Sequence, residues 1–219
     1  ATGKWPAERY LDSQLRLYYC ALVVNIEARN QVVPYDYMDF SRRIGEVWEI
    51  FCKLCWDAPV NIQWRRLTPP SFETVRDELL ESFATLITNG HPSNGEAIMA
   101  QYQRAIDLLG NINLTEDEYC SVGQRTFVID FKSGFGSNEK GNTERLLTVA
   151  KIYGLLPAAH ECVLVVRAAE GDGNNYLQVL KSSGLWKVCC GPEAYEFIRT
   201  LTGFDLAVWI HRNVAFHED

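Results

Sequence analysis

The sequence predicts an α/β protein in which a mixed β-sheet is flanked by helices and preceded by a mainly helical half. Apolar residues recur at helical spacing through much of residues 1–112, whereas residues 113–219 contain short apolar runs that alternate with helical segments. The order strand, strand, helix, strand, helix, strand in the second part is typical of a sheet packed between helices. We expect a single domain over residues 1–219, because a chain of this length can bury one sizeable core.

Four helices are predicted in the first half. Segments 6–29 and 41–56 both place apolar residues on one side of a helix. A Pro-rich break at 66–71 separates them from a third helix over residues 72–87. A fourth helix is expected over residues 96–110, where a glycine ends the periodic pattern.

The second half is predicted to begin with a β-hairpin. Residues 116–122 and 125–132 are strand candidates, and Gly123-Gln124 between them has the length of a tight two-residue turn. In the second of these strands, Phe127, Ile129 and Phe131 fall on one face because successive side chains alternate. We expect that face to pack against a core.

The remaining segments alternate between helix and strand. A helix is expected to start near Asn142, a capping residue, and to cover residues 143–156. The nearly continuous apolar run at 162–167 is typical of a central strand that is covered on both faces. We further expect strands over residues 176–181, 185–190 and 205–211 and a helix over residues 192–203.

Composition narrows the class of protein. The net charge of −7 and the pI of about 5.2 argue against loose, sequence-independent binding to nucleic acid, which depends on a basic surface. Seven cysteines are an odd number in a chain too large to need disulfides, so we expect a reducing, cytoplasmic setting. The apolar run at 18–24 is far shorter than a membrane-spanning helix, so no membrane association is expected.

The hairpin brings acidic residues face to face. Counting outward from the turn places Asp117 directly across from Asp130, at a Cβ separation of roughly 5 Å. Two carboxylates at that distance repel each other unless a cation lies between them. The same register turns Glu116 and Glu118 toward the core side, but a one-residue slip would exchange either of them for Asp117.

A lysine completes the pattern. Lys132 lies two residues beyond Asp130 and therefore on the same face of the strand. Burying an acid and a base on one face is costly unless they are paired or hold a metal. Two carboxylates beside a lysine suit Mg²⁺, which would polarise a phosphate and activate water, while the ammonium orients that water or stabilises charge.

This arrangement resembles the PD-(D/E)XK nuclease superfamily, the fold of type II restriction endonucleases. The resemblance rests on Asp117, the hairpin, Asp130, Lys132 and the helix–strand order that follows, and it covers roughly the second half of the chain. One departure is Glu116, which stands where many members have proline. The resemblance implies a restriction-endonuclease-like fold with a catalytic core over residues 113–219.

The resemblance also implies an activity, namely Mg²⁺-dependent hydrolysis of phosphodiester bonds in double-stranded DNA by a sequence-specific type II restriction enzyme. Asp117, Asp130 and Lys132 would be its catalytic residues. A palindromic target would call for a homodimer, for which the helical half could supply the interface. Two alternatives stay open: a catalytically silent nuclease-fold module that binds DNA or a protein, and a small nucleotide-binding protein, which the absence of a complete glycine-rich phosphate motif disfavours.

The resemblance implies further site residues. A helix glutamate often joins the metal shell in this superfamily, and Glu46, Glu49 and Glu96 are the candidates. With Glu46 in that place, the metal set is Asp117, Asp130, Phe131 and Glu46.

The segment after Lys132 would face DNA. Its glycines allow the backbone to approach the substrate closely, and its polar side chains can bond phosphates or base edges. A flexible surface loop is the alternative interpretation of the same composition. The DNA-binding candidates are Ser133, Asn138, Lys140 and Asn142.

Overall fold

The structure is a computed structural model that describes residues 6–60, 63–108, 110–135, 140–171 and 175–214. Among these residues, no helix has the length and the apolar content that crossing a membrane requires.

One mixed sheet forms the centre of the molecule, with its five strands in the order β1-β2-β3-β4-β5. Strands β1, β2 and β3 pair antiparallel, and strands β3, β4 and β5 pair parallel. Strand β3 is therefore the one where the two kinds of pairing meet. This arrangement confirms the predicted mixed α/β class. The strands are β1 (Trp64–Arg66), β2 (Glu118–Val122), β3 (Arg125–Lys132), β4 (His160–Val166) and β5 (Trp186–Cys190).

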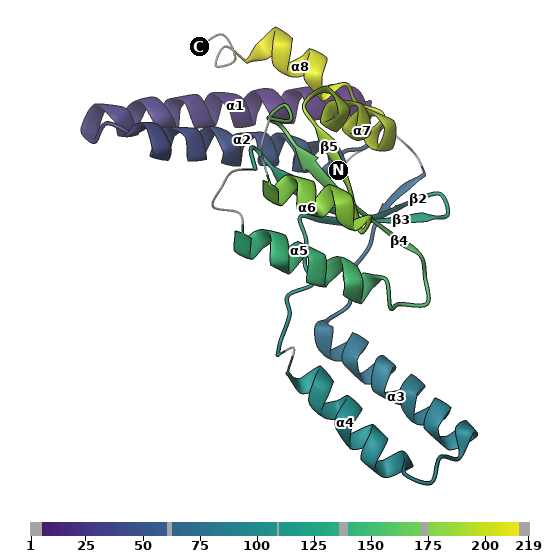
Figure 1. Ribbon diagram of the computed structural model, residues 1–219. Coiled ribbons are helices and arrows are strands. Elements are labelled where there is room, and N and C mark those ends of the chain that lie inside the picture. The colour runs from purple at the N-terminus through teal and green to yellow at the C-terminus, as the bar shows by residue number, and fades with distance from the viewer. Residues whose placement is uncertain (1–5, 61–62, 109, 136–139, 172–174, 215–219) are drawn as a thin grey trace.

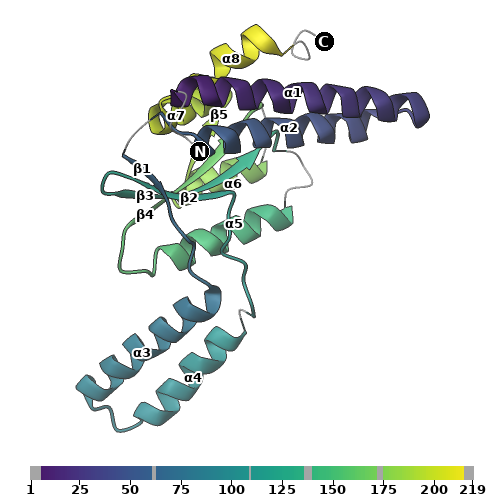
Figure 2. The ribbon, with the colours of Figure 1, turned by 180° about the vertical axis from the view of Figure 1, so that it is seen from behind.

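Helices cover both faces of the sheet (Figures 1 and 2). The alternation along β3 explains the two cores, because Phe127, Ile129 and Phe131 pack toward one layer and Val128 packs toward the other. The predicted core face of this strand is therefore confirmed. One layer contains α1 (Ala7–Val32), α2 (Tyr37–Asp57), α7 (Pro192–Thr202) and α8 (Leu206–Asn213), and the other contains α5 (Lys140–Tyr153) and α6 (Asn175–Ser183).

The predicted helical half divides into two structurally different parts. Helices α1 and α2 pack on the sheet, whereas α3 (Phe72–Gly90) and α4 (Gly95–Asp107) form a helical hairpin that projects away from it (Figure 1). The two arm helices stack on each other through Phe83 and Tyr102, whose ring centroids lie 3.9 Å apart. All four predicted helices are confirmed, with ends that shift by a few residues.

Two predicted strands are helices instead. Residues 176–181 lie in α6, and residues 205–211 lie almost entirely in α8. Their buried residues are three apart, Leu177 with Leu180 and Leu206 with Trp209, which is helical and not strand spacing.

The beginning of α8 also has a capping signal that the sequence interpretation overlooked. The Asp205 carboxylate accepts a hydrogen bond from the Val208 N–H at 3.0 Å, and Asp is among the preferred N-cap residues. Strand β1 was missed as well, because three residues are too few for a periodic pattern to show.

Candidate active site

The end of β3 gathers acidic and basic side chains from four parts of the chain. Helix α2 contributes from one layer, α5 contributes from the other, and the segment that leads into β2 lies between them. We call these residues the carboxylate cluster: Glu49, Lys53, Glu116, Asp117, Asp130, Lys132 and Arg145.

The predicted hairpin register is confirmed. Val122 pairs with Arg125 across the two-residue turn, and Gly123 in that turn has a φ of 62°, which favours glycine. The ladder continues to Glu118 opposite Ile129. Asp117 therefore lies one residue beyond the last pair, next to the end of β3.

Both oxygens of Asp117 have partners. Oδ2 accepts the Phe131 N–H at 2.8 Å, and Oδ1 lies 2.9 Å from Nζ of Lys53. Burial alone would raise the pKa of this carboxyl, but the Phe131 N–H and the Lys53 ammonium hold the pKa below its ordinary value. The like-charge repulsion expected from the sequence is thus relieved by a lysine that the sequence interpretation did not include.

Asp130 is more deeply buried than Asp117, with 4% of its side chain exposed against 19%. Nζ of Lys132 donates to Oδ1 at 3.1 Å and also to the Phe131 carbonyl at 3.1 Å. Oδ2 lies 2.8 Å from the same nitrogen but makes no hydrogen bond within the described structure. Burial, opposed only in part by Lys132, raises the pKa of Asp130 to about 7.

Of the three candidate helix glutamates, Glu49 is the one that belongs to the cluster. Burial and the charge of Asp117 raise its pKa, and Lys53 and Lys132 act in the opposite direction. Glu46 is exposed and pairs with Arg43 at 2.6 Å. Glu96 lies in the first turn of α4, on the projecting arm (Figure 1).

Glu116 does not face the core side that the register predicts. Its side chain is only 1% exposed, and its carboxylate accepts a hydrogen bond from Nη1 of Arg145 at 2.6 Å, while Nη2 of the same arginine lies 3.7 Å from Oδ1 of Asp130. The regular ladder begins at Glu118, so strand alternation does not govern a residue two positions earlier. Arg145 therefore joins Glu116 to the Asp130 side of the sheet.

Glu118 lies on the face opposite Asp130, as the register predicts. Its buried carboxylate accepts two hydrogen bonds from Arg66, each of 2.7 Å. This bidentate pair connects β1 to β2, and we interpret it as a structural pair because charged groups at that depth require a partner.

The DNA-binding candidates occupy different environments. Ser133 packs against Gly45 of α2, where a Cβ added to the glycine would approach the Ser133 Cβ to 2.9 Å. Lys140 is exposed at the start of α5, and the Asn142 side chain accepts from Arg145 at 3.3 Å. Asn138 lies outside the described residues.

The cluster offers oxygen ligands of the kind Mg²⁺ prefers. The buried Asp130 Oδ2 has no hydrogen-bond partner in the described structure, and the neighbouring Phe131 carbonyl already accepts from an ammonium group. Within the described residues, however, no three His, Cys, Asp or Glu side chains are close enough to hold a metal. Two carboxylates fit Mg²⁺ nonetheless, because this ion usually keeps several waters.

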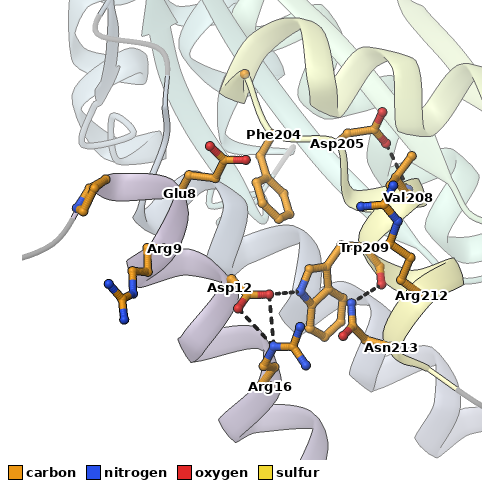
Figure 3. A pocket seen from close by; sticks show the side chains of 12 residues that line it. Glu8, Arg9, Asp12, Arg16, Phe204, Asp205, Val208, Trp209, Arg212 and Asn213 are labelled. Atoms are coloured by element: carbon orange, nitrogen blue, oxygen red, sulfur yellow. Dashed lines mark hydrogen bonds and ion pairs between the residues drawn. The ribbon is translucent and has the colours of Figure 1, made fainter.

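A second charged cluster lies in the layer that contains α1, α2, α7 and α8. It lies beside a cavity of about 790 Å³ between the start of α1 and α8 (Figure 3). Asp12 accepts the Trp209 indole N–H at 2.8 Å and pairs with Arg16 at 3.0 Å. Both carboxylate oxygens of Asp12 are hydrogen-bonded. This cluster attaches α8 to α1, and we call it the α1–α8 cluster.

The sequence matches no protein-family model, and neither the curated proteins nor the solved structures contain a match. The resemblance to the PD-(D/E)XK superfamily therefore rests on the residues of this chain alone.

Proposed function

We propose that the protein is a Mg²⁺-dependent DNA endonuclease of the type II restriction kind. The observation that supports this best is that two acids meet at the end of β3, where Asp117 accepts the N–H of Phe131, the residue that follows the buried Asp130. Lys132 lies 2.8 Å from Oδ2 of Asp130 but opposes the cost of burying this carboxylate only in part, and a divalent cation would relieve more of that cost. The parallel strand ends beside the cluster are also where open α/β sheets place their ligands.

The proposed roles follow from the contacts. Asp117, Asp130 and the Phe131 carbonyl would hold the metal, which supplies a Lewis acid for the phosphate and an acidic bound water. Among the helix glutamates, Glu49 is the one whose pKa the charge of Asp117 raises, but it is not part of the proposed metal set, because no three carboxylates of the described residues are close enough to hold one ion. Lys132 orients water or stabilises negative charge on the phosphate, since its ammonium group already lies between Asp130 and the Phe131 carbonyl.

The substrate and the assembly are proposals of the same kind. Double-stranded DNA would reach the cluster past Ser133, Lys140 and Asn142, which lie between the end of β3 and the first turn of α5. A palindromic target would be read by a homodimer, because a two-fold site requires two copies of the reading surface. The acidic chain is consistent with a sequence-specific enzyme and not with a nonspecific nuclease.

Cleavage of supercoiled plasmid and phage DNA tests the proposal directly. We expect cutting with Mg²⁺ or Mn²⁺, and binding without turnover with Ca²⁺, which prefers a higher coordination number. Lys132→Ala should abolish cutting, whereas Lys151→Ala, an exposed lysine on the far part of α5, should cut normally. Full cleavage in excess chelator would contradict the proposed metal site.

A catalytically silent nuclease-fold module is the alternative. The same experiment distinguishes it, because such a module would cut DNA with no metal, and it would shift DNA in a gel if its partner is DNA and leave it unshifted if its partner is a protein. Sequencing the ends of digested phage DNA would then identify the target if cleavage occurs.

A further inference from the structure

Lys53 occupies a position that the nuclease signature does not assign. It lies on α2, one helical turn after Glu49, and its Nζ is 2.9 Å from Oδ1 of Asp117. The other oxygen of Asp117 accepts the Phe131 N–H. A metal ion bound through Oδ1 of Asp117 would therefore compete with the Lys53 ammonium group for that oxygen.

The attachment of Lys53 allows such an exchange. Its neighbours on α2, Cys52 and Cys55, are buried in the core, so the backbone at this position is held in place. The side chain itself has 43% of its surface exposed, whereas 19% of the Asp117 side chain is exposed. A lysine has a flexible four-carbon stem, so the ammonium group can leave Asp117 without any movement of the helix.

The charge balance of the cluster gives a reason for the exchange. Four carboxylates face three cations, which leaves a net charge of −1 when all are ionised. A bound divalent cation would change this net charge to +1. The metal would then neutralise Asp117 in place of Lys53, and the exposed Lys53 ammonium would be left without its carboxylate partner. A DNA phosphate carries the negative charge that would balance it.

We propose that Lys53 has two successive partners: it neutralises Asp117 before the metal binds, and it contacts a phosphate of the DNA backbone afterwards. This inference rests on the proposed nuclease function and adds a substrate-contacting residue to it. It gives Lys53 opposite effects on the two ligands, because the same ammonium group competes with the metal and attracts the DNA.

Metal binding without DNA tests the first role. A calorimetric titration of the full chain with Mn²⁺ alone measures this competition. Lys53→Gln should bind Mn²⁺ about two- to five-fold more tightly than the wild type, the range that corresponds to the loss of a partly exposed ion pair. Lys53→Arg keeps the charge and should bind Mn²⁺ like the wild type. Lys151→Gln is the matched control and should also be unchanged. Equal or weaker Mn²⁺ binding by Lys53→Gln would overturn the first role.

DNA binding in Ca²⁺ tests the second role. Lys53→Gln should weaken binding similarly for all sequences and reduce the slope of log K against log salt by about one. Lys53→Arg should restore the slope. A lysine with a purely structural role would leave this slope unchanged, so an unchanged slope in Lys53→Gln overturns the phosphate contact.

The outcomes separate this inference from the proposed function. If the wild type binds Mn²⁺ and DNA but never cuts, the nuclease proposal fails, and the two titrations still decide the role of Lys53. If neither the wild type nor Lys53→Gln binds Mn²⁺, both proposals are wrong. Thermal melts of each variant show whether a change in binding reflects a loss of folding.

Discussion

The carboxylate cluster and the α1–α8 cluster combine the same kinds of residue and differ in burial. In the α1–α8 cluster, 37% of the Asp12 side chain is exposed and both of its oxygens are hydrogen-bonded. In the carboxylate cluster, 4% of the Asp130 side chain is exposed, and Oδ2 lies 2.8 Å from the Lys132 ammonium without a hydrogen bond of regular geometry. The hydrogen bonds from Arg16 lower the pKa of Asp12, whereas burial raises the pKa of Asp130 to about 7.

This difference shows how the two kinds of cluster can be distinguished. A charged group near the surface whose hydrogen bonds are satisfied, such as Asp12 between α1 and α8, needs no ligand to explain it. A charged group that is buried and only partly satisfied is destabilising by itself, and such groups gather at functional sites. The volume of the nearby cavity does not decide the matter, because the cavity of about 790 Å³ lies at the α1–α8 cluster.

The largest expected difference between the clusters is in DNA cleavage. Asp130→Asn should lower single-turnover cleavage with Mg²⁺ by at least about 100-fold, because it removes a proposed ligand of the metal that would act on the phosphate. Asp117→Asn should do the same, and Glu118→Gln should keep most activity. Asp12→Asn, in the α1–α8 cluster, is the matched control and should cut within about two-fold of the wild type. Equal losses in Asp130→Asn and Asp12→Asn would remove the functional distinction between the two clusters.

The next effect concerns stability at the α1–α8 cluster. Trp209→Phe removes the indole N–H that binds Asp12, and we expect it to lower the free energy of unfolding by about 1.5–3 kcal/mol, the range for hydrogen bonds to charged groups. Urea unfolding measures this change. Cleavage at a temperature well below the melting point should be unaffected. A large loss of cleavage in folded Trp209→Phe would show that this cluster takes part in the reaction.

A smaller effect, of opposite sign, is expected at Asp130 when no metal is present. The pKa of about 7 in the folded state lies above the unfolded value, so the folded protein binds more protons between the two values. The contribution of Asp130 to the free energy of unfolding is therefore largest below the unfolded pKa, and it is lost as the pH rises through about 7. Asp130→Asn should therefore raise the free energy of unfolding at pH 8 in chelator and change it little at pH 4, where the folded carboxyl is already protonated.

Asp117 supplies the internal control for that prediction. Its pKa is lowered by the Phe131 N–H and Lys53 despite burial, so Asp117→Asn should destabilise the metal-free protein at pH 8. Thermal melts of the two variants side by side measure the signs. Destabilisation by both substitutions would mean that Lys132 and Arg145 satisfy Asp130 as fully as Lys53 satisfies Asp117.

The smallest effect is expected at Asp12. Its lowered pKa stabilises the folded state above the unfolded pKa, and this contribution is lost as the pH falls through the folded value. Because the pair with Arg16 is partly exposed, Asp12→Asn should cost at most about 1 kcal/mol at pH 7, and the difference should disappear near pH 2. Melting curves across this pH range check both the sign and the size. A difference that persists at pH 2 would show that it does not come from the charge of Asp12.

The candidate site could be predicted from the sequence where local rules apply. A two-residue turn at Gly123 sets the pairing of the two strands, and the observed ladder from Val122 to Glu118 follows the predicted register; Asp117, one residue beyond the ladder, accepts the N–H of Phe131, the residue after Asp130. Glu116 was placed wrongly because it precedes the ladder, where strand alternation no longer applies. The distinction between Glu46 and Glu49 could not be made, since both lie on one helix and only packing determines which one faces the sheet.

The sequence by itself determined the mixed α/β class, the hairpin register and the neighbourhood of Asp117, Asp130 and Lys132, because periodicity, turn length and strand alternation act over a few residues. Only the tertiary structure decided that Lys53 and Arg145, from helices in opposite layers, neutralise the acids at the end of β3. It also decided that residues 176–181 and 205–211 are helical. Such pairings depend on how helices far apart in the chain pack on one sheet, and the free energy of that packing is not contained in any short segment.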